Sequence, residues 1–169
     1  MRASAPRRRA KAAAAAQIRL LILDVDGVLT DGRLHYGPKG ETHKSFHVRD
    51  GAGIKAVLSA GLDVAVISGR SSAAVTRRCR ELGIRHVHQG VDDKGAMLQR
   101  LLKQLRLQAN QCACVGDDTP DLPVMRQVGL AVAVADAHEQ VLASAHRRTR
   151  KPGGAGAVRE VCDWLLQEG

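Results

Sequence analysis

Aromatic side chains are nearly absent from this chain of 169 residues, which holds one Trp, one Tyr and one Phe. A hydrophobic core must therefore be built from Val, Leu, Ile and Ala, and the chain is long enough to bury such a core in one domain. No aromatic platform for stacking on nucleic-acid bases accompanies the basic N-terminal segment either. We therefore expect no specific nucleic-acid partner despite the net charge of +9.

Acidic residues are absent from the first 16 positions, which carry five basic residues, so more than half of the excess positive charge lies there. This composition, with its run of five alanines, predicts a disordered or partly helical arm over residues 1–17 that binds polyanions weakly at most. The alanine run is short for a signal peptide, and a transit peptide is an alternative interpretation of the arm.

Long apolar runs and cysteines at C-x-x-C spacing are also missing. No stretch reaches the length of a membrane span, so we expect no membrane contact. The four cysteines, Cys79, Cys112, Cys114 and Cys162, contain no C-x-x-C pair, and the histidines lack ligand spacing. We therefore expect small buried thiols in a reducing cytoplasm rather than a cysteine metal site.

Short apolar strands alternate with helices after residue 17. Strands are predicted at 19–24, 62–68, 85–88, 112–116 and 130–134, and helices near 51–60, 71–82, 92–106, 119–127, 137–144 and 155–167. This alternation is typical of a doubly wound parallel sheet of the α/β class. We expect it to form one domain over residues 18–169.

Two carboxylates, Asp24 and Asp26, follow directly after the first apolar strand. Like charges two residues apart repel each other and are costly to desolvate, so a cation or a phosphate site explains them better than packing does. The alternative is a solvated turn at the end of a strand.

A second acidic cluster, Asp117, Asp118 and Asp121, follows the strand at 112–116. Loops at the carboxyl ends of strands in an open parallel sheet gather in one crevice, so we expect the two clusters to meet. Carboxylate oxygens without a His or Cys ligand set favour Mg²⁺, which keeps coordination positions for water and phosphate. The two clusters together predict a magnesium site for phosphoryl transfer.

Two further segments carry groups that suit a phosphate. Ser68, Gly69 and Arg70 end the strand at 62–68 with a hydroxyl, a flexible glycine and a guanidinium. Lys94 stands at the start of a predicted helix, where the positive end of the helix dipole disfavours a cation. Each feature also has a structural explanation, as a common turn and as a solvated first-turn lysine, and Asp92 is expected to cap that helix.

The order of these motifs, D-x-D-G, S-G-R, K and G-D-D-x-x-D, resembles the haloacid dehalogenase phosphatase superfamily. Within it, the segments DVDGVLTDG, FHVRDGAGIK, VISGR and GGAGAVREVCD are similar to those of the family of 3-deoxy-D-manno-octulosonate 8-phosphate phosphatases. The resemblance covers nearly all of the chain after the first 17 residues. It implies a Rossmann-like fold and a Mg²⁺-dependent hydrolase that releases phosphate from this sugar acid in lipopolysaccharide precursor synthesis.

The superfamily resemblance also implies catalytic roles for the motif residues. Asp24 is the expected nucleophile that forms an aspartyl-phosphate, and Asp26 is the expected proton donor and acceptor. Ser68 and Lys94 are expected to bind the transferring phosphoryl group.

The implied ligands of the magnesium ion are the Asp24 carboxylate, the Asp26 main-chain carbonyl and the Asp117 carboxylate. Asp118 is expected nearby or acting through water. Asp121 is expected to orient Lys94 or the metal loop.

The spacing between the first two motifs leaves no room for a separate cap domain. Residues 30–48 remain as an insert, predicted to form a β-hairpin from Arg33–Tyr36 and Thr42–Val48. A lone two-stranded ribbon is marginal in water, so its aromatic residues, Tyr36 and Phe46, need a surface to cover. That surface is either the parent domain or, as the resemblance implies, a second subunit of a homotetramer whose neighbours help to close each active site.

Arg49 and Asp50 follow the hairpin, in a segment that the resemblance places near the sugar acid. A guanidinium from Arg49 or Arg70 can pair with a carboxylate in bidentate geometry. Arg49, Asp50, Gly69 and Arg70 are therefore the candidate substrate-binding residues. The alternative is that Asp50 caps a helix and Arg49 is a solvated strand end.

A second basic cluster, at residues 147–151, precedes a glycine-rich segment and the last predicted helix. It is either a solvated linker or a source of positive charge near an anionic substrate.

Three classes of function remain open from the sequence. The first is a phosphatase of 3-deoxy-D-manno-octulosonate 8-phosphate, and the second is a phosphatase of another acidic sugar phosphate, such as a nonulosonate 9-phosphate. The third is a non-catalytic oligomeric or polyanion-binding module of the same fold. The intact set of motifs favours the first two.

Overall fold

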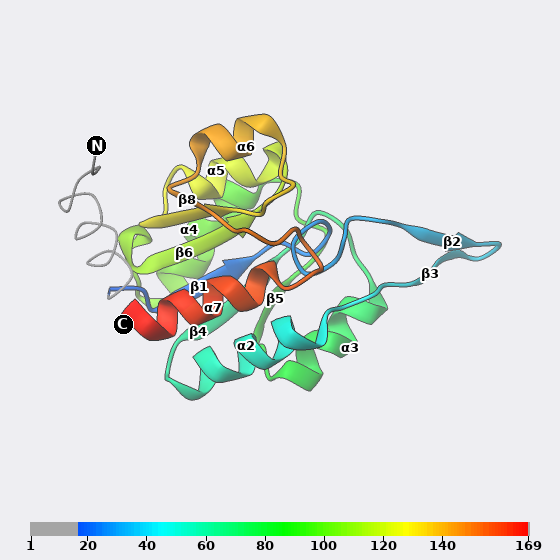
Figure 1. Ribbon diagram of the computed structural model, residues 1–169, viewed down its shortest axis with the longest axis horizontal. Coiled ribbons are helices and arrows are strands. Elements are labelled where there is room, and N and C mark those ends of the chain that lie inside the picture. Colours follow the sequence, from blue (N-terminus) through cyan, green and yellow to red (C-terminus); the bar gives the residue numbers. More distant parts are fainter. Residues whose placement is uncertain (1–16, 169) are drawn as a thin grey trace.

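Six parallel strands form the central sheet, in the order β5-β4-β1-β6-β7-β8 (Figure 1). The computed structural model describes residues 17–168, so nearly all of the arm predicted over residues 1–17 lies outside the described residues. The strands are β1 (Leu20–Leu23), β4 (Asp63–Ile67), β5 (His86–His88), β6 (Cys112–Gly116), β7 (Leu130–Ala133) and β8 (Arg147–Arg148). This topology confirms the doubly wound parallel sheet of the α/β class.

Helices cover both faces of this sheet. Figure 1 shows α2, α3 and α7 on one side and α4, α5 and α6 on the other. Their bounds are α2 (Val48–Ser59), α3 (Ala73–Leu82), α4 (Lys94–Leu105), α5 (Leu122–Met125), α6 (Glu139–Ser144) and α7 (Ala157–Glu168), with 3₁₀ turns η1 (Ala109–Gln111) and η2 (Thr119–Asp121). Among residues 17–168, no helix combines the length and the apolarity that a membrane span requires.

The core is built from aliphatic side chains, as the scarcity of aromatic residues requires. All residues of β1, β6 and β7 are buried, which is typical of parallel strands covered on both faces. The four cysteines are buried free thiols within this core.

The pairing register brings the ends of three strands to one edge of the sheet. Leu23, the last residue of β1, pairs with Val66 of β4 on one side and with Val115 of β6 on the other. The first residues after β1, β4 and β6 are Asp24, Ser68 and Asp117, respectively. These side chains therefore start from neighbouring positions at the carboxyl edge, which is where open parallel sheets form their crevices.

The predicted hairpin is present but shorter than expected. Its strands β2 (His35–Gly37) and β3 (Gly40–His43) form a separate antiparallel ribbon that projects from the sheet (Figure 1). Phe46 lies beyond the ribbon and packs against the protein's own core, whereas Tyr36 is exposed. The two aromatic residues therefore have different surroundings.

Several predicted boundaries were wrong. Helix α2 begins at Val48 rather than Gly51, because His47 caps it by accepting a hydrogen bond from the Arg49 amide. Asp50 is consequently a first-turn residue of α2 and not the cap of that helix.

Other predicted elements differ in their caps, their division or their number. Asp93, not Asp92, caps α4 through the Ala96 amide. The helix predicted over 119–127 divides into η2 and α5, and the strand β8 was not predicted.

The glycine-rich segment before α7 lies against the loop that follows β1. A Cβ atom on Gly153 would overlap the carbonyl oxygen of Gly27, and the Gly154 amide donates to the Val28 carbonyl at 3.0 Å. The Gly153 amide donates to Asp136 at 3.0 Å. The C-terminal segment therefore supports the loop that carries Asp24 and Asp26.

We expect Gly153→Ala to lower the free energy of unfolding by about 1–3 kcal/mol, because a methyl group must displace packed backbone. Urea unfolding followed by circular dichroism measures this change. Ala155→Ser, at an exposed position of the same segment, serves as the matched control. Equal stabilities of the two variants would contradict this close packing.

Candidate active site

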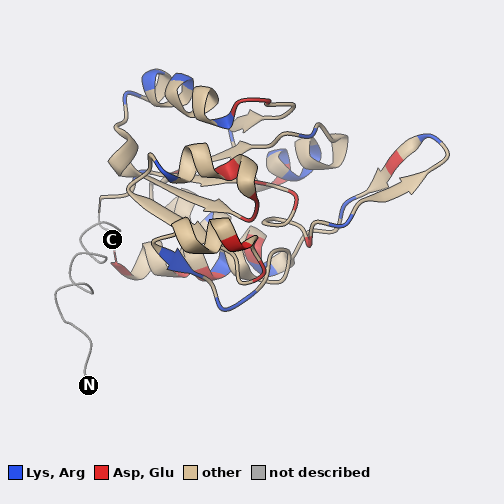
Figure 2. Cartoon of the chain, turned by 90° about the horizontal axis from the view of Figure 1, so that it is seen from above, with Lys and Arg blue, Asp and Glu red and all other residues tan. Residues whose placement is uncertain are grey.

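The carboxyl edge of the sheet carries an open cavity lined mainly by charged and polar residues. Figure 2 shows acidic segments gathered in the loops at the end of the sheet from which the hairpin projects. The lining residues are Asp24, Asp26, Gly32, Ser68, Gly69, Arg70, Lys94, Asp117, Asp118, Pro120 and Asp121. The structure thus brings the four sequence motifs into one place.

Three carboxylates form the floor of this cavity. Asp24, Asp117 and Asp121 each offer an oxygen, and these oxygens lie within 4.8 Å of one another. Burial, together with the neighbouring charge of Asp121, raises the pKa of Asp24 to about 6. Burial and the charges of Asp24 and Asp121 raise the pKa of Asp117 to about 8.

The donor set fits a hard divalent cation. One Asp117 oxygen, Oδ1, is buried without a hydrogen-bond partner in the structure, an expensive state for a carboxylate that lacks a counter-charge. All donor atoms in the cluster are oxygens, as Mg²⁺ prefers. A bound cation would relieve both the repulsion and the missing contact.

Glycine at position 27 allows the two acidic loops to approach. Gly27 has φ +88°, in the left-handed region, and a Cβ atom there would overlap the Asp117 carboxylate. The D-x-D-G motif therefore needs its glycine for backbone conformation and for space.

Lys94 is buried between two of the carboxylates. Its Nζ lies 2.9 Å from Asp24 Oδ1 and 2.7 Å from Asp121 Oδ1, and the side chain is 6% exposed. Burial alone would lower the pKa of Lys94, but the charges of Asp24 and Asp121 outweigh it and hold the pKa above its usual range. The lysine therefore stays charged. Its contacts with the two carboxylates offset the unfavourable position of a cation at the start of α4.

Asp121 links this lysine to the acidic loop. Its second oxygen accepts hydrogen bonds from the Asp117 amide at 3.0 Å and the Asp118 amide at 3.4 Å. Asp121 therefore contacts both groups that the sequence suggested, the lysine and the metal loop.

Ser68 is buried at the end of β4, and its hydroxyl accepts a hydrogen bond from the Arg70 amide at 3.4 Å. Gly69 and Arg70 continue around the rim, and Arg70 Nε lies 3.8 Å from Asp26 Oδ2. This part of the cavity lining presents a hydroxyl and a guanidinium, the latter beside the Asp26 carboxylate.

Two hairpin residues near Asp26 were missed by the sequence analysis. Lys44 Nζ lies 2.6 Å from Asp26 Oδ1, and Glu41 lies 3.2 Å from the same lysine nitrogen. A lysine and a glutamate on a short polar ribbon carry no signal of their own, because their role depends on the distant residues that they contact in the fold.

Chemically, the cavity combines a buried carboxylate held by an ammonium group, an oxygen donor set for a cation, and hydrogen-bond donors around an open space. Such a set can bind a phosphate group and bring a carboxylate against its phosphorus atom.

Comparisons with known proteins agree with this chemistry. A family model described as haloacid dehalogenase-like hydrolase matches residues 84–160. The 3-deoxy-D-manno-octulosonate 8-phosphate phosphatase KdsC of Yersinia pestis is 53% identical over 152 residues, which are 90% of this chain and 81% of that protein. The chain belongs to the family of 3-deoxy-D-manno-octulosonate 8-phosphate phosphatases.

Solved structures of this family share the fold. The Yersinia pestis phosphatase has a TM-score of 0.92 at 50% identity, covering 94% of this chain and 86% of that one. The Moraxella catarrhalis phosphatase, solved in complex with magnesium ion, phosphate ion and KDO, has a TM-score of 0.90 at 46% identity, covering 93% and 90%.

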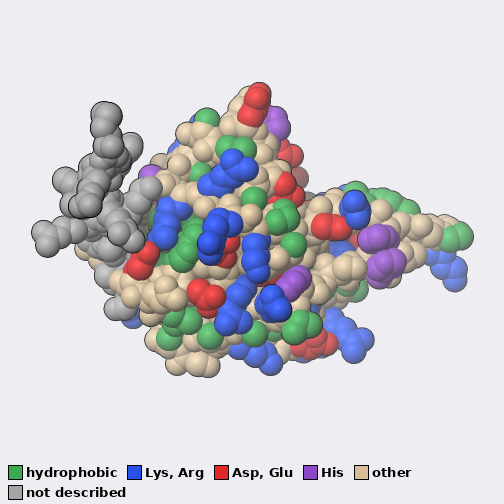
Figure 3. All heavy atoms as spheres, viewed as in Figure 1, with side chains coloured by type: hydrophobic (Ala, Val, Ile, Leu, Met, Phe, Trp, Pro, Cys, Tyr) green, Lys and Arg blue, Asp and Glu red, His purple; other side chains and the backbone are tan. Residues whose placement is uncertain are grey.

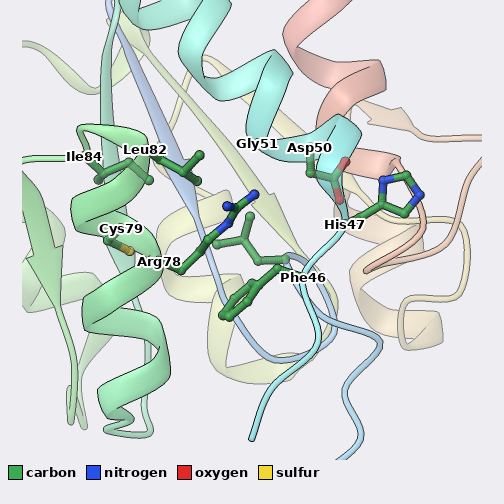
Figure 4. Close-up of a pocket in the computed structure, with 9 residues that line it drawn as sticks. Phe46, His47, Asp50, Gly51, Arg78, Cys79, Leu82 and Ile84 are labelled. Carbon is green, nitrogen blue, oxygen red and sulfur yellow. The ribbon is translucent and has the colours of Figure 1, made fainter.

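Two of the candidate substrate-binding residues of this family member lie outside the cavity. Asp50 is buried beside Phe46 and His47 (Figure 4), and its Oδ1 accepts a hydrogen bond from the Arg159 amide at 2.8 Å. It caps the first turn of α7, which packs against α2. Arg49 is exposed, and neither residue is brought together with Ser68 or Lys94.

The basic cluster at 147–151 pairs with α7 instead of facing the cavity. Arg147 lies over the Trp164 ring at 4.0 Å and pairs with Glu168 at 2.8 Å, and Arg150 pairs with Glu160 at 3.4 Å. Figure 3 shows Lys and Arg side chains gathered on the face that α7 covers. Part of this positive charge is therefore neutralised locally.

We expect Asp117→Asn to remove the magnesium-dependent rise in melting temperature without lowering the melting temperature of the metal-free protein. The variant loses a cation ligand and also a buried carboxylate that Asp24 and Asp121 repel. Each kcal/mol gained in the metal-free state raises the melting temperature by about 2–4 °C.

Thermal unfolding with and without MgCl₂ measures both effects. Asp92→Asn, the same substitution at an exposed position, is the control. A variant that keeps the full magnesium-dependent shift would remove Asp117 from the ligand set.

Proposed function

We propose that this protein is a Mg²⁺-dependent phosphatase that converts 3-deoxy-D-manno-octulosonate 8-phosphate to the sugar acid and phosphate, a step of lipopolysaccharide precursor synthesis. The observation that carries the proposal is the Lys94 ammonium between Asp24 and Asp121, with Asp117 within the same 4.8 Å cluster. Membership of the family supports the choice of substrate.

In the first step, an Asp24 carboxylate oxygen attacks the phosphorus atom and forms an aspartyl-phosphate. The bond between phosphorus and the sugar oxygen breaks, and the electron pair stays on the sugar oxygen. Asp26, two residues further along the same loop, donates a proton to that oxygen. The sugar acid leaves as a neutral alcohol at this position.

In the second step, water attacks the phosphorus atom of the aspartyl-phosphate. Asp26, now ionised, accepts a proton from that water. The bond between phosphorus and the Asp24 oxygen breaks, so the Asp24 carboxylate is restored and inorganic phosphate is released.

The Asp24 carboxylate, the Asp26 main-chain carbonyl and the Asp117 carboxylate would hold the Mg²⁺ ion, with Asp118 close by. When bound, the ion neutralises charge that would otherwise keep a carboxylate nucleophile away from a phosphate dianion. Asp121 positions Lys94 and the amides of the 117–118 loop.

Ser68 and Lys94 bind the oxygens of the transferring phosphoryl group. Gly69 lines the cavity beside Ser68. Arg70, on the cavity rim with its side chain 42% exposed, is the candidate partner for the carboxylate of the sugar acid. Arg49 and Asp50 lie elsewhere in this chain, so we assign no substrate contact within the same subunit to them.

We expect Asp24→Asn to abolish phosphate release while the protein stays folded, because an amide cannot act as the nucleophile. Phosphate release from 3-deoxy-D-manno-octulosonate 8-phosphate with MgCl₂ measures the loss, and circular dichroism reports the fold. Asp63→Asn, at the opposite end of the parallel strand β4, is a control that should keep full activity.

Retained activity in the Asp24 variant would remove this residue as the nucleophile. A nonulosonate 9-phosphate tested beside the first substrate distinguishes the two sugar-acid classes. Wild-type protein that hydrolyses only the nonulosonate compound would contradict the proposed substrate.

The hairpin supports a proposal on assembly. Leu34 is 41% exposed and Tyr36 is 62% exposed, so the ribbon offers apolar surface that the parent domain leaves uncovered. We propose that the protein forms a homotetramer through this hairpin. Each subunit would consist of one phosphatase domain over residues 18–169 and a basic arm over residues 1–17.

We expect sedimentation equilibrium at micromolar concentration to give the mass of a tetramer. Tyr36→Asp and Leu34→Asp should shift it towards the monomer, because buried charge without a partner is costly. Lys39→Asp, at the exposed turn, is the control. A monomeric wild-type protein would contradict the assembly.

The four buried free thiols support a reducing compartment. We place the enzyme in the cytoplasm on this ground, acting on a small-molecule substrate without a nucleic-acid or membrane partner.

A further inference from the structure

A lysine of the hairpin is buried against the proposed acid–base residue. The Lys44 side chain is 2% exposed, and its Nζ lies 2.6 Å from Asp26 Oδ1. A lysine is rarely buried to this extent unless its charge is paired. The pairing with Asp26 therefore fixes both the end of the hairpin and the direction of the Asp26 carboxyl group.

Glu41 completes a network of alternating charges. Its Oε2 lies 3.2 Å from Lys44 Nζ and 3.4 Å from Arg70 Nη2, and Arg70 Nε lies 3.8 Å from the other Asp26 oxygen. Each Asp26 oxygen thus faces one cation, and Glu41 contacts both of these cations. Arg70 also donates to the Tyr36 hydroxyl at 2.9 Å, which gives the rim a second contact with the ribbon.

The start of α3 shows that this network is built into the domain. Ser72 is the N-cap residue of α3, but its side chain makes no capping hydrogen bond. The Ser72 hydroxyl instead donates to Glu41 Oε1 at 2.6 Å. This hydrogen bond and the contacts with Lys44 and Arg70 lower the pKa of Glu41, so the glutamate stays ionised against its cations.

We propose that Lys44 is a positioning residue for catalysis, which orients the Asp26 carboxyl group for proton transfer and is itself held by Glu41. This inference rests on the proposed function, because it assigns the proton transfer to Asp26. The hairpin then has a role in the chemical step of its own subunit.

Two substrates with different leaving groups depend differently on a proton from Asp26. The alcohol of a sugar phosphate leaves with a proton from Asp26 as its bond to phosphorus breaks. A p-nitrophenolate ion leaves from p-nitrophenyl phosphate without a proton. Misorienting Asp26 should therefore slow phosphoryl transfer from the sugar phosphate and leave phosphoryl transfer from p-nitrophenyl phosphate almost unchanged.

The experiment compares Lys44→Met with wild type in single-turnover and burst measurements with MgCl₂. We expect release of the sugar acid from 3-deoxy-D-manno-octulosonate 8-phosphate to slow by about 100-fold, the lower end of what a general acid contributes. The burst of p-nitrophenolate should keep its rate within about threefold, while the steady state after the burst slows, because water activation also uses Asp26. Lys44→Arg should recover most of the loss, and Glu41→Gln should change the rates in the same direction as Lys44→Met.

Lys39→Met removes an exposed lysine from the turn of the same hairpin and should behave as wild type. Equal slowing by Lys44→Met of phosphoryl transfer to the enzyme from both substrates, or a raised Michaelis constant with unchanged turnover, would overturn the positioning role. Unchanged rates with both substrates would also overturn it. Wild-type protein that hydrolyses neither compound would contradict the proposed function itself, before any variant is compared.

Discussion

The contact of one buried ammonium group with two carboxylates organises this protein. Lys94 lies within 3 Å of both Asp24 and Asp121, and Asp117 completes a cluster of three acids. One ammonium against three carboxylates leaves two negative charges when all are ionised, which one divalent cation balances. The excess of carboxylates over ammonium groups thus favours binding of a divalent cation, and the contact with Lys94 holds the Asp24 side chain in place.

The parallel sheet makes this concentration of charge possible. The in-register ends of β1, β4 and β6 deliver a carboxylate, a hydroxyl and a second carboxylate to one edge. Aliphatic strands buried on both faces supply the stability that the polar edge lacks. Gly27 and Gly153 then let three backbone segments meet where any side chain would overlap its neighbour.

Much of this site can be predicted from the sequence because its signals are local. Asp24, Ser68, Lys94 and Asp117 each follow a short apolar strand or begin a helix, and parallel topology brings such positions together. Helix boundaries are less predictable, because His47 rather than a residue nearer to Gly51 caps α2. Here a side chain four residues before Gly51 decides where the helix starts.

The remaining features depend on contacts between distant segments. Asp50 stands in a motif beside the hairpin, yet it accepts from the Arg159 amide, 109 residues away. Glu41 and Lys44 acquire their role only through contacts with Arg70 and Asp26, which lie on other loops. Neither periodicity nor spacing encodes those contacts, so residue type alone could not reveal them.

The central claim is that Asp24 becomes transiently phosphorylated. Acid quenching during turnover, followed by borohydride reduction and peptide mass spectrometry, tests it directly, because reduction converts an aspartyl-phosphate to homoserine. The account predicts this conversion at position 24 and at no other aspartate. Full turnover with an unmodified Asp24, or conversion at Asp26 or Asp117 instead, would contradict it.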